Sequence, residues 1–220
     1  GDGVTYYRRN GPGDWTVESI GSGELTYKYS TSIAVDPDGV PHITYYDQGG
    51  NDLALASRGD TGWDIAHIDT EGETGLFSSL VIDADGRFHV SYFEKKSPSS
   101  GVVKYATRAP GETDWTILEV GTLENLAFGF IGARNITSIA IDASGNPWIA
   151  YSDESRVMLA IWRGSEWQVE TVAESPAEDL GQLVSLKLDA VGDPHIAYFR
   201  VTSRSPLNGV ITYARGSSSP

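Results

Sequence analysis

Short runs of β-branched, aromatic and small apolar residues recur along the whole chain, separated by Gly, Asp, Pro and Ser. Runs of this kind are typical of antiparallel strands, and no segment has the apolar period of an amphipathic helix. The stretch SIAVDPDGVPHITYYD (32–47) places two apolar runs on either side of a D-x-x-G turn. The aspartate can accept hydrogen bonds from the turn backbone, and the glycine can adopt the positive φ that such a turn requires. We therefore predict a β-hairpin here.

This hairpin occurs four times, which makes the sequence a repeat. Its turn aspartates are spaced by 47, 59 and 47 residues and are Asp36, Asp83, Asp142 and Asp189. Each hairpin is followed by an apolar run that ends in arginine, such as LALASR (53–58). Four of these arginine-ending runs are followed by a run that begins at a tryptophan, such as WDIAHI (63–68). Each repeat thus supplies up to four short strands over about 50 residues, a period typical of β-propeller blades.

A single four-stranded sheet cannot cover both of its faces, so several such sheets have to stack around an axis. We predict an all-β fold, a small β-propeller of four-stranded antiparallel blades that forms one domain over residues 1–220. Its repeats cover approximately residues 21–70, 71–122, 123–174 and 175–216. Residues 1–20 are expected to complete the last blade, so that pairing of the N- and C-terminal strands closes the ring. Four blades are favoured, but the run ending in arginine occurs five times, so a five-bladed ring or part of a longer array is the alternative.

The composition narrows the classes of partner. The formal net charge is −14 and the 16 Lys and Arg residues are scattered, whereas nucleic-acid binding needs clustered basic residues. No apolar run approaches the roughly 20 residues that span a bilayer, so neither nucleic acid nor a membrane is an expected partner. The absence of cysteine excludes disulfides, thiolate catalysis and cysteine-bound metals. None of these features predicts the oligomeric state.

The four hairpins share the pattern S-[IL]-x-[VIL]-D-x-x-G-x-[PF]-[HW]-[IV]. In this they resemble the β-propeller repeats of bacterial extracytoplasmic proteins in the broad sialidase-like group, and the likeness covers nearly the whole chain. They are similar to the Asp-box of that group but depart from it, since the Asp-box places Ser, Asp and Gly closer together and follows them with an aromatic residue. The resemblance implies a propeller fold and a secreted or cell-surface location in a bacterium. It leaves the activity open, because no arginine cluster of the sialidase-like active site can be mapped here.

The loops point to one face as the place of a binding site. The loops after the second and fourth strands vary in length, and in a four-stranded meander they emerge on the same face, where function tends to reside. The ends of the second strands bring aromatic and acidic side chains to this face, where they could stack on and hydrogen-bond a sugar. The expected ligand-binding residues are Tyr46, Asp47, Phe93, Glu94, Asp153, Phe199 and Arg200, with Arg134 from the long insertion at 123–137. The alternative is that the aromatic rings pack between blades and the acids are solvated strand ends.

Metal binding and catalysis are more specific alternatives to sugar binding for several of these residues. Asp47, Glu94 and Asp153 are the candidate ligands of a calcium ion, and no other cofactor is expected. Three histidines recur at one repeat position, where a ring of imidazoles could bind a transition metal. However, Trp148 fills the fourth position, which favours a ring that packs on a neighbouring blade and hydrogen-bonds through its nitrogen. The turn aspartates are likewise expected to serve the turn rather than catalysis or calcium.

The sequence favours a non-catalytic module that recognises a glycan or an extracellular protein through the variable loop face. No catalytic residue is assigned. One alternative is a glycoside hydrolase or lyase that acts on a polysaccharide, which requires two carboxylates flanking the sugar. A further alternative is a structural repeat scaffold without a ligand.

Overall fold

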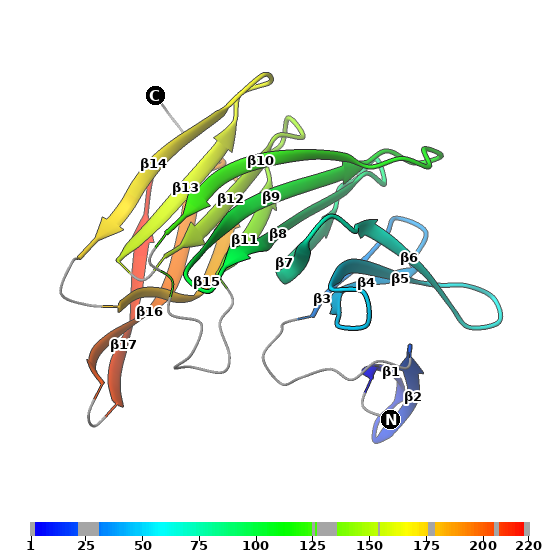
Figure 1. The fold of residues 1–220 in the computed structure, drawn as a ribbon. Coiled ribbons are helices and arrows are strands. Elements are labelled where there is room, and N and C mark those ends of the chain that lie inside the picture. The colour runs from blue at the N-terminus through cyan, green and yellow to red at the C-terminus, as the bar shows by residue number, and fades with distance from the viewer. Residues whose placement is uncertain are drawn as a thin grey trace.

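The structure, a computed structural model, describes residues 3–21, 31–124, 126, 136–153, 155–175, 179–204 and 207–217. In this part of the chain seventeen β-strands form five antiparallel sheets (Figure 1). No helix among these residues has the length and apolar character needed to cross a membrane. The fold is therefore all-β, as the sequence predicts.

Each of the three central sheets has four strands in chain order and follows one repeat of the sequence. Sheet 1 contains β3 (Ser32–Val35), β4 (Pro41–Asp47), β5 (Asp52–Arg58) and β6 (Trp63–Asp69). Sheet 2 contains β7 (Glu73–Ile82), β8 (Phe88–Ser97), β9 (Ser100–Arg108) and β10 (Thr116–Leu123). Sheet 3 contains β11 (Thr137–Ile141), β12 (Pro147–Ser152), β13 (Arg156–Trp162) and β14 (Trp167–Glu174).

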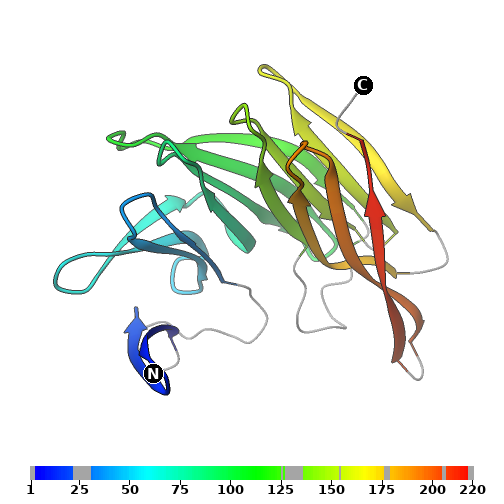
Figure 2. The same cartoon turned by 180° about the vertical axis from the view of Figure 1, so that it is seen from behind.

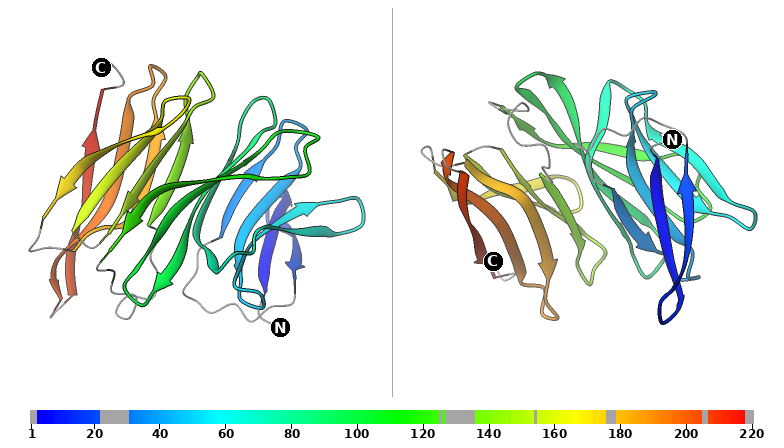
Figure 3. Two further views of the ribbon diagram at one scale, coloured as in Figure 1. Left: turned by 45° about the horizontal axis from the view of Figure 1, so that its top comes forward. Right: turned by 90° about the horizontal axis from the view of Figure 1, so that it is seen from below.

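The two remaining sheets have fewer strands, and they are the first and the last along the chain. The N-terminal ribbon contains β1 (Val4–Gly11) and β2 (Asp14–Ile20), and sheet 4 contains β15 (Asp179–Leu188), β16 (Pro194–Arg204) and β17 (Leu207–Arg215). The five sheets follow one another in chain order along an open arc, with the N-terminal ribbon and sheet 4 at its opposite ends (Figures 1 and 2). Two further views, one of them from below, give the same order (Figure 3).

The apolar core lies between neighbouring sheets, because each sheet buries its facing side chains against the next one. Between sheets 3 and 4, for example, Leu159 packs in one cluster with Leu186 and Ile196. Buried apolar surface of this kind stabilises by about 25 cal/mol per Å². The junctions between sheets therefore hold the arc together.

A serine on the first strand also links each complete sheet to the following one. Ser32 Oγ accepts a hydrogen bond from the Leu80 N–H (2.9 Å), and Ser79 Oγ accepts one from the Ile139 N–H (3.3 Å). Ser138 Oγ accepts one from the Leu186 N–H (3.0 Å). These are the serines that open the repeated hairpin pattern, so one sequence position makes the same contact at all three junctions.

The predicted closure of the ring is not present in the described residues. Residues 1–20 do not complete sheet 4, since β1 and β2 form a sheet of their own. Val4 and Ile20 of this ribbon pack instead in one cluster with Ile43 of sheet 1. Instead β2 pairs with β1 and not with the outer edge of β17, so sheet 4 has three strands in the described residues. The number of blades in a closed ring stays a prediction.

Candidate functional site

Each hairpin turn is organised by its aspartate. Asp142 Oδ1 accepts hydrogen bonds from the N–H groups of Ser144 (2.8 Å) and Asn146 (2.9 Å). Its Oδ2 accepts one from Trp148 Nε1 (3.2 Å). The other turns repeat these contacts with a histidine ring in place of the indole; the pairs are Asp36 with His42 (3.1 Å), Asp83 with His89 (3.2 Å) and Asp189 with His195 (3.2 Å). This confirms the turn role predicted for the aspartates and the hydrogen-bonded rings predicted beside them.

The turn carboxylates are held in their ionised form. Burial alone would raise the pKa of Asp142, but the hydrogen bonds from Asn146 and Trp148 outweigh it and lower that pKa. The pKa of Asp189 is lowered chiefly by its hydrogen bond with His195. Each of these two turns therefore presents a negative charge at neutral pH.

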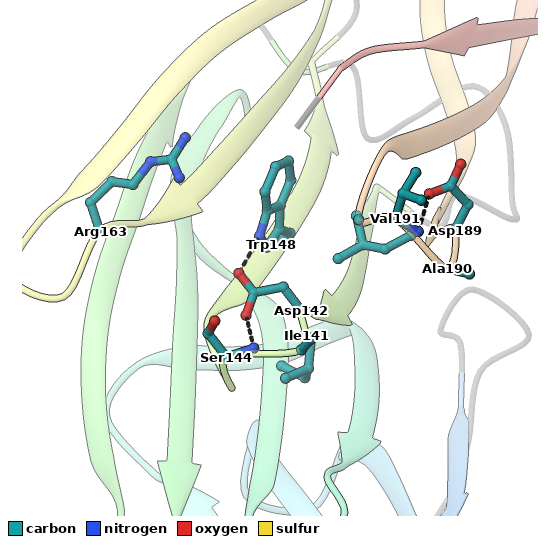
Figure 4. A pocket seen from close by; sticks show the side chains of 11 residues that line it. Ile141, Asp142, Ser144, Trp148, Arg163, Asp189, Ala190 and Val191 are labelled. Atoms are coloured by element: carbon teal, nitrogen blue, oxygen red, sulfur yellow. Dashed lines mark hydrogen bonds between the residues drawn. The ribbon is translucent and has the colours of Figure 1, made fainter. Parts of the chain in front are cut away.

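A hollow of about 350 Å³ lies between the turns of sheets 3 and 4 (Figure 4). Its lining includes Asp142, Ser144, Trp148, Arg163, Asp189 and Val191. Arg163 follows β13, and its guanidinium carbon lies 5.8 Å from the centre of the Trp148 ring. Its Nε donates a hydrogen bond to Gln168 Oε1 (2.9 Å), which fixes the side chain from the other side.

These groups are suited to binding a polyhydroxylated ring. The Arg163 guanidinium can donate paired hydrogen bonds to neighbouring hydroxyl groups, and the Asp142 and Asp189 carboxylates add negative charge beside it. The Trp148 indole lines the hollow from the apolar core and is itself only 4% exposed. The hollow is formed by the turns between first and second strands. It therefore lies on the face opposite to the variable loops where the sequence predicts the site.

The structure places four of the predicted site residues in its interior. Tyr46, Phe93, Glu94 and Asp153 are all buried. The Tyr46 hydroxyl donates to Asn51 Oδ1 (2.7 Å), and Asp153 Oδ2 accepts from Arg156 Nε (2.9 Å) and Nη2 (2.6 Å). Side chains with such internal partners contact a ligand only after rearrangement.

Glu94 belongs to a buried ionic cluster between sheets 1 and 2. Lys104 Nζ lies 2.8 Å from Glu94 Oε2 and 3.0 Å from Asp69 Oδ2, and all three side chains are at most one-tenth exposed. The Tyr92 hydroxyl donates to Asp69 Oδ2 (2.8 Å). Lys96 pairs with the other oxygen of Glu94 from the surface. The cluster joins the two sheets at the loop face.

The remaining predicted residues are less buried. Asp47 lies near the surface, where its Oδ2 is 3.1 Å from His67 Nε2. Phe199 and Arg200 are half-buried on β16. Arg134 lies outside the described residues, as does most of the 123–137 insertion. The ligand-binding role of all these residues stays a prediction.

The described residues contain no group of three or more His, Asp or Glu side chains placed to hold a metal ion. The three acids proposed for calcium have separate partners: His67 for Asp47, Lys104 for Glu94 and Arg156 for Asp153. Calcium binding by these acids stays a prediction.

The sequence analysis assigned neither Arg163 nor Trp148 of the hollow to a binding site. In the sequence, Arg163 is one of the arginines that end an apolar run, and Trp148 is predicted to pack on a neighbouring blade. Two signals point to them: the tryptophan replaces a histidine found in the other three repeats, and an arginine recurs at the end of each third strand. The hollow itself needs two turns whose aspartates are 47 residues apart in the sequence.

No protein-family model matches this sequence, and no curated protein matches it. Among solved structures, the chain is similar to an α-L-arabinofuranosidase of Fusarium graminearum in complex with an iminosugar inhibitor. The identity is 11%, the TM-score is 0.60, and the match covers 87% of this chain and 64% of that chain. It is also similar to the Aleuria aurantia lectin in complex with a fucosylated sugar, with 12% identity and a TM-score of 0.55 over 97% of this chain and 71% of the lectin.

A third similar structure is a protein of unknown function from Dyadobacter fermentans, with 14% identity and a TM-score of 0.53 over 88% of this chain and 67% of that chain. At such identities the likeness concerns the fold alone. The chain spans 64% of the length of the arabinofuranosidase, which is less than two thirds. Together with the antiparallel four-stranded sheets, these similarities identify an all-β, β-propeller-like fold.

Proposed function

We propose that this chain is a non-catalytic module that binds a glycan in the hollow between sheets 3 and 4. The observation that carries the proposal is the meeting of the Arg163 guanidinium with the ionised carboxylates of Asp142 and Asp189 around one space of about 350 Å³, which the buried Trp148 indole also lines. A monosaccharide unit fits a site of this chemistry, because its hydroxyls can bind the charged groups. The similarity in fold to a lectin and to a glycosidase supports the same class of ligand.

Binding is favoured over hydrolysis by the state of the two carboxylates. A glycosidase needs one carboxyl group with a raised pKa that protonates the leaving oxygen. The pKa of Asp142 and that of Asp189 are both lowered, so neither holds a proton at neutral pH. The hydrolase alternative therefore lacks its general acid in this hollow.

The test begins with a glycan and polysaccharide array, followed by titration of any hit monitored by tryptophan fluorescence. Arg163→Ala is expected to weaken binding at least about tenfold, which corresponds to roughly 1.4 kcal/mol. The matched control is Arg108→Ala, since Arg108 ends the third strand of sheet 2 and lies 4.7 Å from the Trp115 ring, away from the hollow. It should leave binding unchanged.

A blank array would contradict the proposal. Equal losses for Arg163→Ala and Arg108→Ala would contradict the placement of the site. If Asp47→Ala weakened binding while Arg163→Ala did not, the site would lie on the variable loop face instead. That outcome would support the location predicted from the sequence.

A further inference from the structure

The outer face of sheet 4 is an exposed copy of a surface that is buried elsewhere in the molecule. Directly opposite residues on neighbouring antiparallel strands share a face. Ser185, Ala197 and Tyr213 form one such row across sheet 4. The equivalent row in sheet 2 is Ser79, Ser91 and Tyr105. Sheet 3 covers the row in sheet 2, whereas no described residues cover the row in sheet 4.

The exposed fractions express this difference. Tyr213 is 61% exposed, and its neighbour Ile211 on the same face is 83% exposed. Tyr105 and Val103, the residues at the same register positions in sheet 2, are 5% and 0% exposed. Leu183 adds to the exposed face, while its counterpart Phe77 is buried. Large apolar side chains that gather on one exposed face mark an interaction surface.

The serine of this row is also exposed. Ser32, Ser79 and Ser138 each accept a backbone N–H from the following sheet. Ser185 occupies the same position, and no described residue donates to it. The outer face of sheet 4 thus carries the apolar side chains and the serine that, in sheets 1 to 3, contact the following sheet.

At the opposite end of the arc, the N-terminal ribbon also has an exposed outer face with large apolar side chains. In the N-terminal ribbon, Arg9 lies opposite Trp15 and Tyr7 lies opposite Val17, so these four side chains share one face. Trp15 is 53% exposed, and Tyr7 and Val17 are exposed as well. The other face of the ribbon packs on sheet 1 through Val4 and Ile20.

A repeated aromatic contact shows how these two faces fit together. Tyr6 of the ribbon meets Trp63 of sheet 1 edge-on, with ring centres 5.1 Å apart. Tyr105 of sheet 2 meets Trp167 of sheet 3 in the same way at 5.5 Å. In each case a third-strand tyrosine contacts the tryptophan that begins the fourth strand of the following sheet. Tyr213 is the third such tyrosine, and Trp15 is a fourth-strand tryptophan with no sheet before it in the described residues.

We propose that the outer face of sheet 4 in one copy of this chain binds the outer face of the N-terminal ribbon in a second copy. Tyr213 and Ile211 of one copy then pack on Trp15 of the other, which repeats the aromatic contact of the junctions within the chain. In the described residues, the two-stranded ribbon has no first strand to donate an N–H to Ser185. The two faces lie at opposite ends of the arc, so the contact forms between copies (Figures 1 and 3). Such a head-to-tail contact is heterologous and leads to a ring or to an open chain.

The first experiment is sedimentation velocity of the full chain over a wide concentration range. The wild type is expected to associate as the concentration rises, and Ile211→Asp and Trp15→Asp are each expected to weaken association at least about tenfold. The matched control is Val169→Asp, because Val169 is a partly exposed apolar residue on β14 of sheet 3, away from both faces. Both test residues are largely exposed, so circular dichroism should confirm intact folding.

Mixing the two variants tests the geometry. Ile211→Asp retains an intact ribbon, and Trp15→Asp retains an intact sheet 4, so the mixture should give a one-to-one dimer that grows no further. A wild type that stays monomeric at all concentrations would overturn the proposal, whether the faces meet within one chain or serve a different partner. Undiminished self-association of Trp15→Asp would also overturn it, because sheet 4 would then pack on another sheet 4.

Discussion

The buried ionic cluster at Lys104 allows a quantitative test of what joins sheets 1 and 2. Lys104→Met keeps most of the side-chain volume and removes the ammonium that lies 2.8 Å from Glu94 and 3.0 Å from Asp69. Two buried carboxylates are then left without their common cation. Removing one partner of a buried ion pair costs about 3–5 kcal/mol, because the remaining charge is desolvated and uncompensated. For a chain of this size, that corresponds to a fall in melting temperature of about 6–20 °C.

The assay is urea unfolding monitored by tryptophan fluorescence, with Lys96→Met as the control. Lys96 pairs with the same Glu94, but its side chain is 53% exposed. An exposed ion pair contributes about 0–1 kcal/mol to the free energy of unfolding, so the control should change little. If the two variants lost the same stability to within about 1 kcal/mol, the buried pair would not be the source of the effect, and the reasoning would be refuted.

The cluster also gives the sign of a pH dependence. Burial alone would raise the pKa of Asp69, but hydrogen bonds from the Glu71 N–H, Tyr92 and Lys104 outweigh it, so the pKa lies below its ordinary value. The stability from Asp69 is therefore present above the unfolded pKa of about 3.9 and is lost as the pH falls through the folded pKa. Below about pH 4 the difference between wild type and Lys104→Met should shrink, because the carboxylates left by the substitution become neutral.

Two further predictions concern the junctions and are measured by the same unfolding assay. Gly75 has φ +94°, and a Cβ there would lie 2.6 Å from Leu53 Cα, so Gly75→Ala should destabilise by more than the roughly 1–2 kcal/mol that a left-handed conformation alone costs. Gly13→Ala, with φ +78° and open space around it, is the control for the conformation alone, and an equal loss would refute the close contact. Ser138→Ala leaves the buried Leu186 N–H without its acceptor and should cost about 1–3 kcal/mol. Ser185→Ala, measured in dilute solution, should cost less than about 0.5 kcal/mol, and a similar loss in both variants would count against the junction contact.

The hairpins and the four-stranded sheets follow from the sequence alone. Their turns depend on hydrogen bonds between Asp142, or an equivalent aspartate, and residues at most six positions further on, so local residue identity is sufficient. The four-stranded sheets of the three central repeats follow from the same local alternation of apolar runs and turns. These parts of the fold could be predicted because each depends on neighbours in the chain.

Where the side chains at the strand ends point depends on how the sheets pack. Glu94 and Asp153 look alike in the sequence as acids that end a second strand, yet Glu94 is paired with Lys104 between two sheets and Asp153 with Arg156 in its own loop. The ribbon formed by residues 4–20 could have completed sheet 4 beside β17, but its Val4 and Ile20 pack on sheet 1 instead. The hollow beside Trp148 and the exposed face at Ile211 likewise depend on which sheet lies next to which. Contacts of this kind join residues from different repeats, so the packing of sheets decides them rather than the pattern of any one repeat.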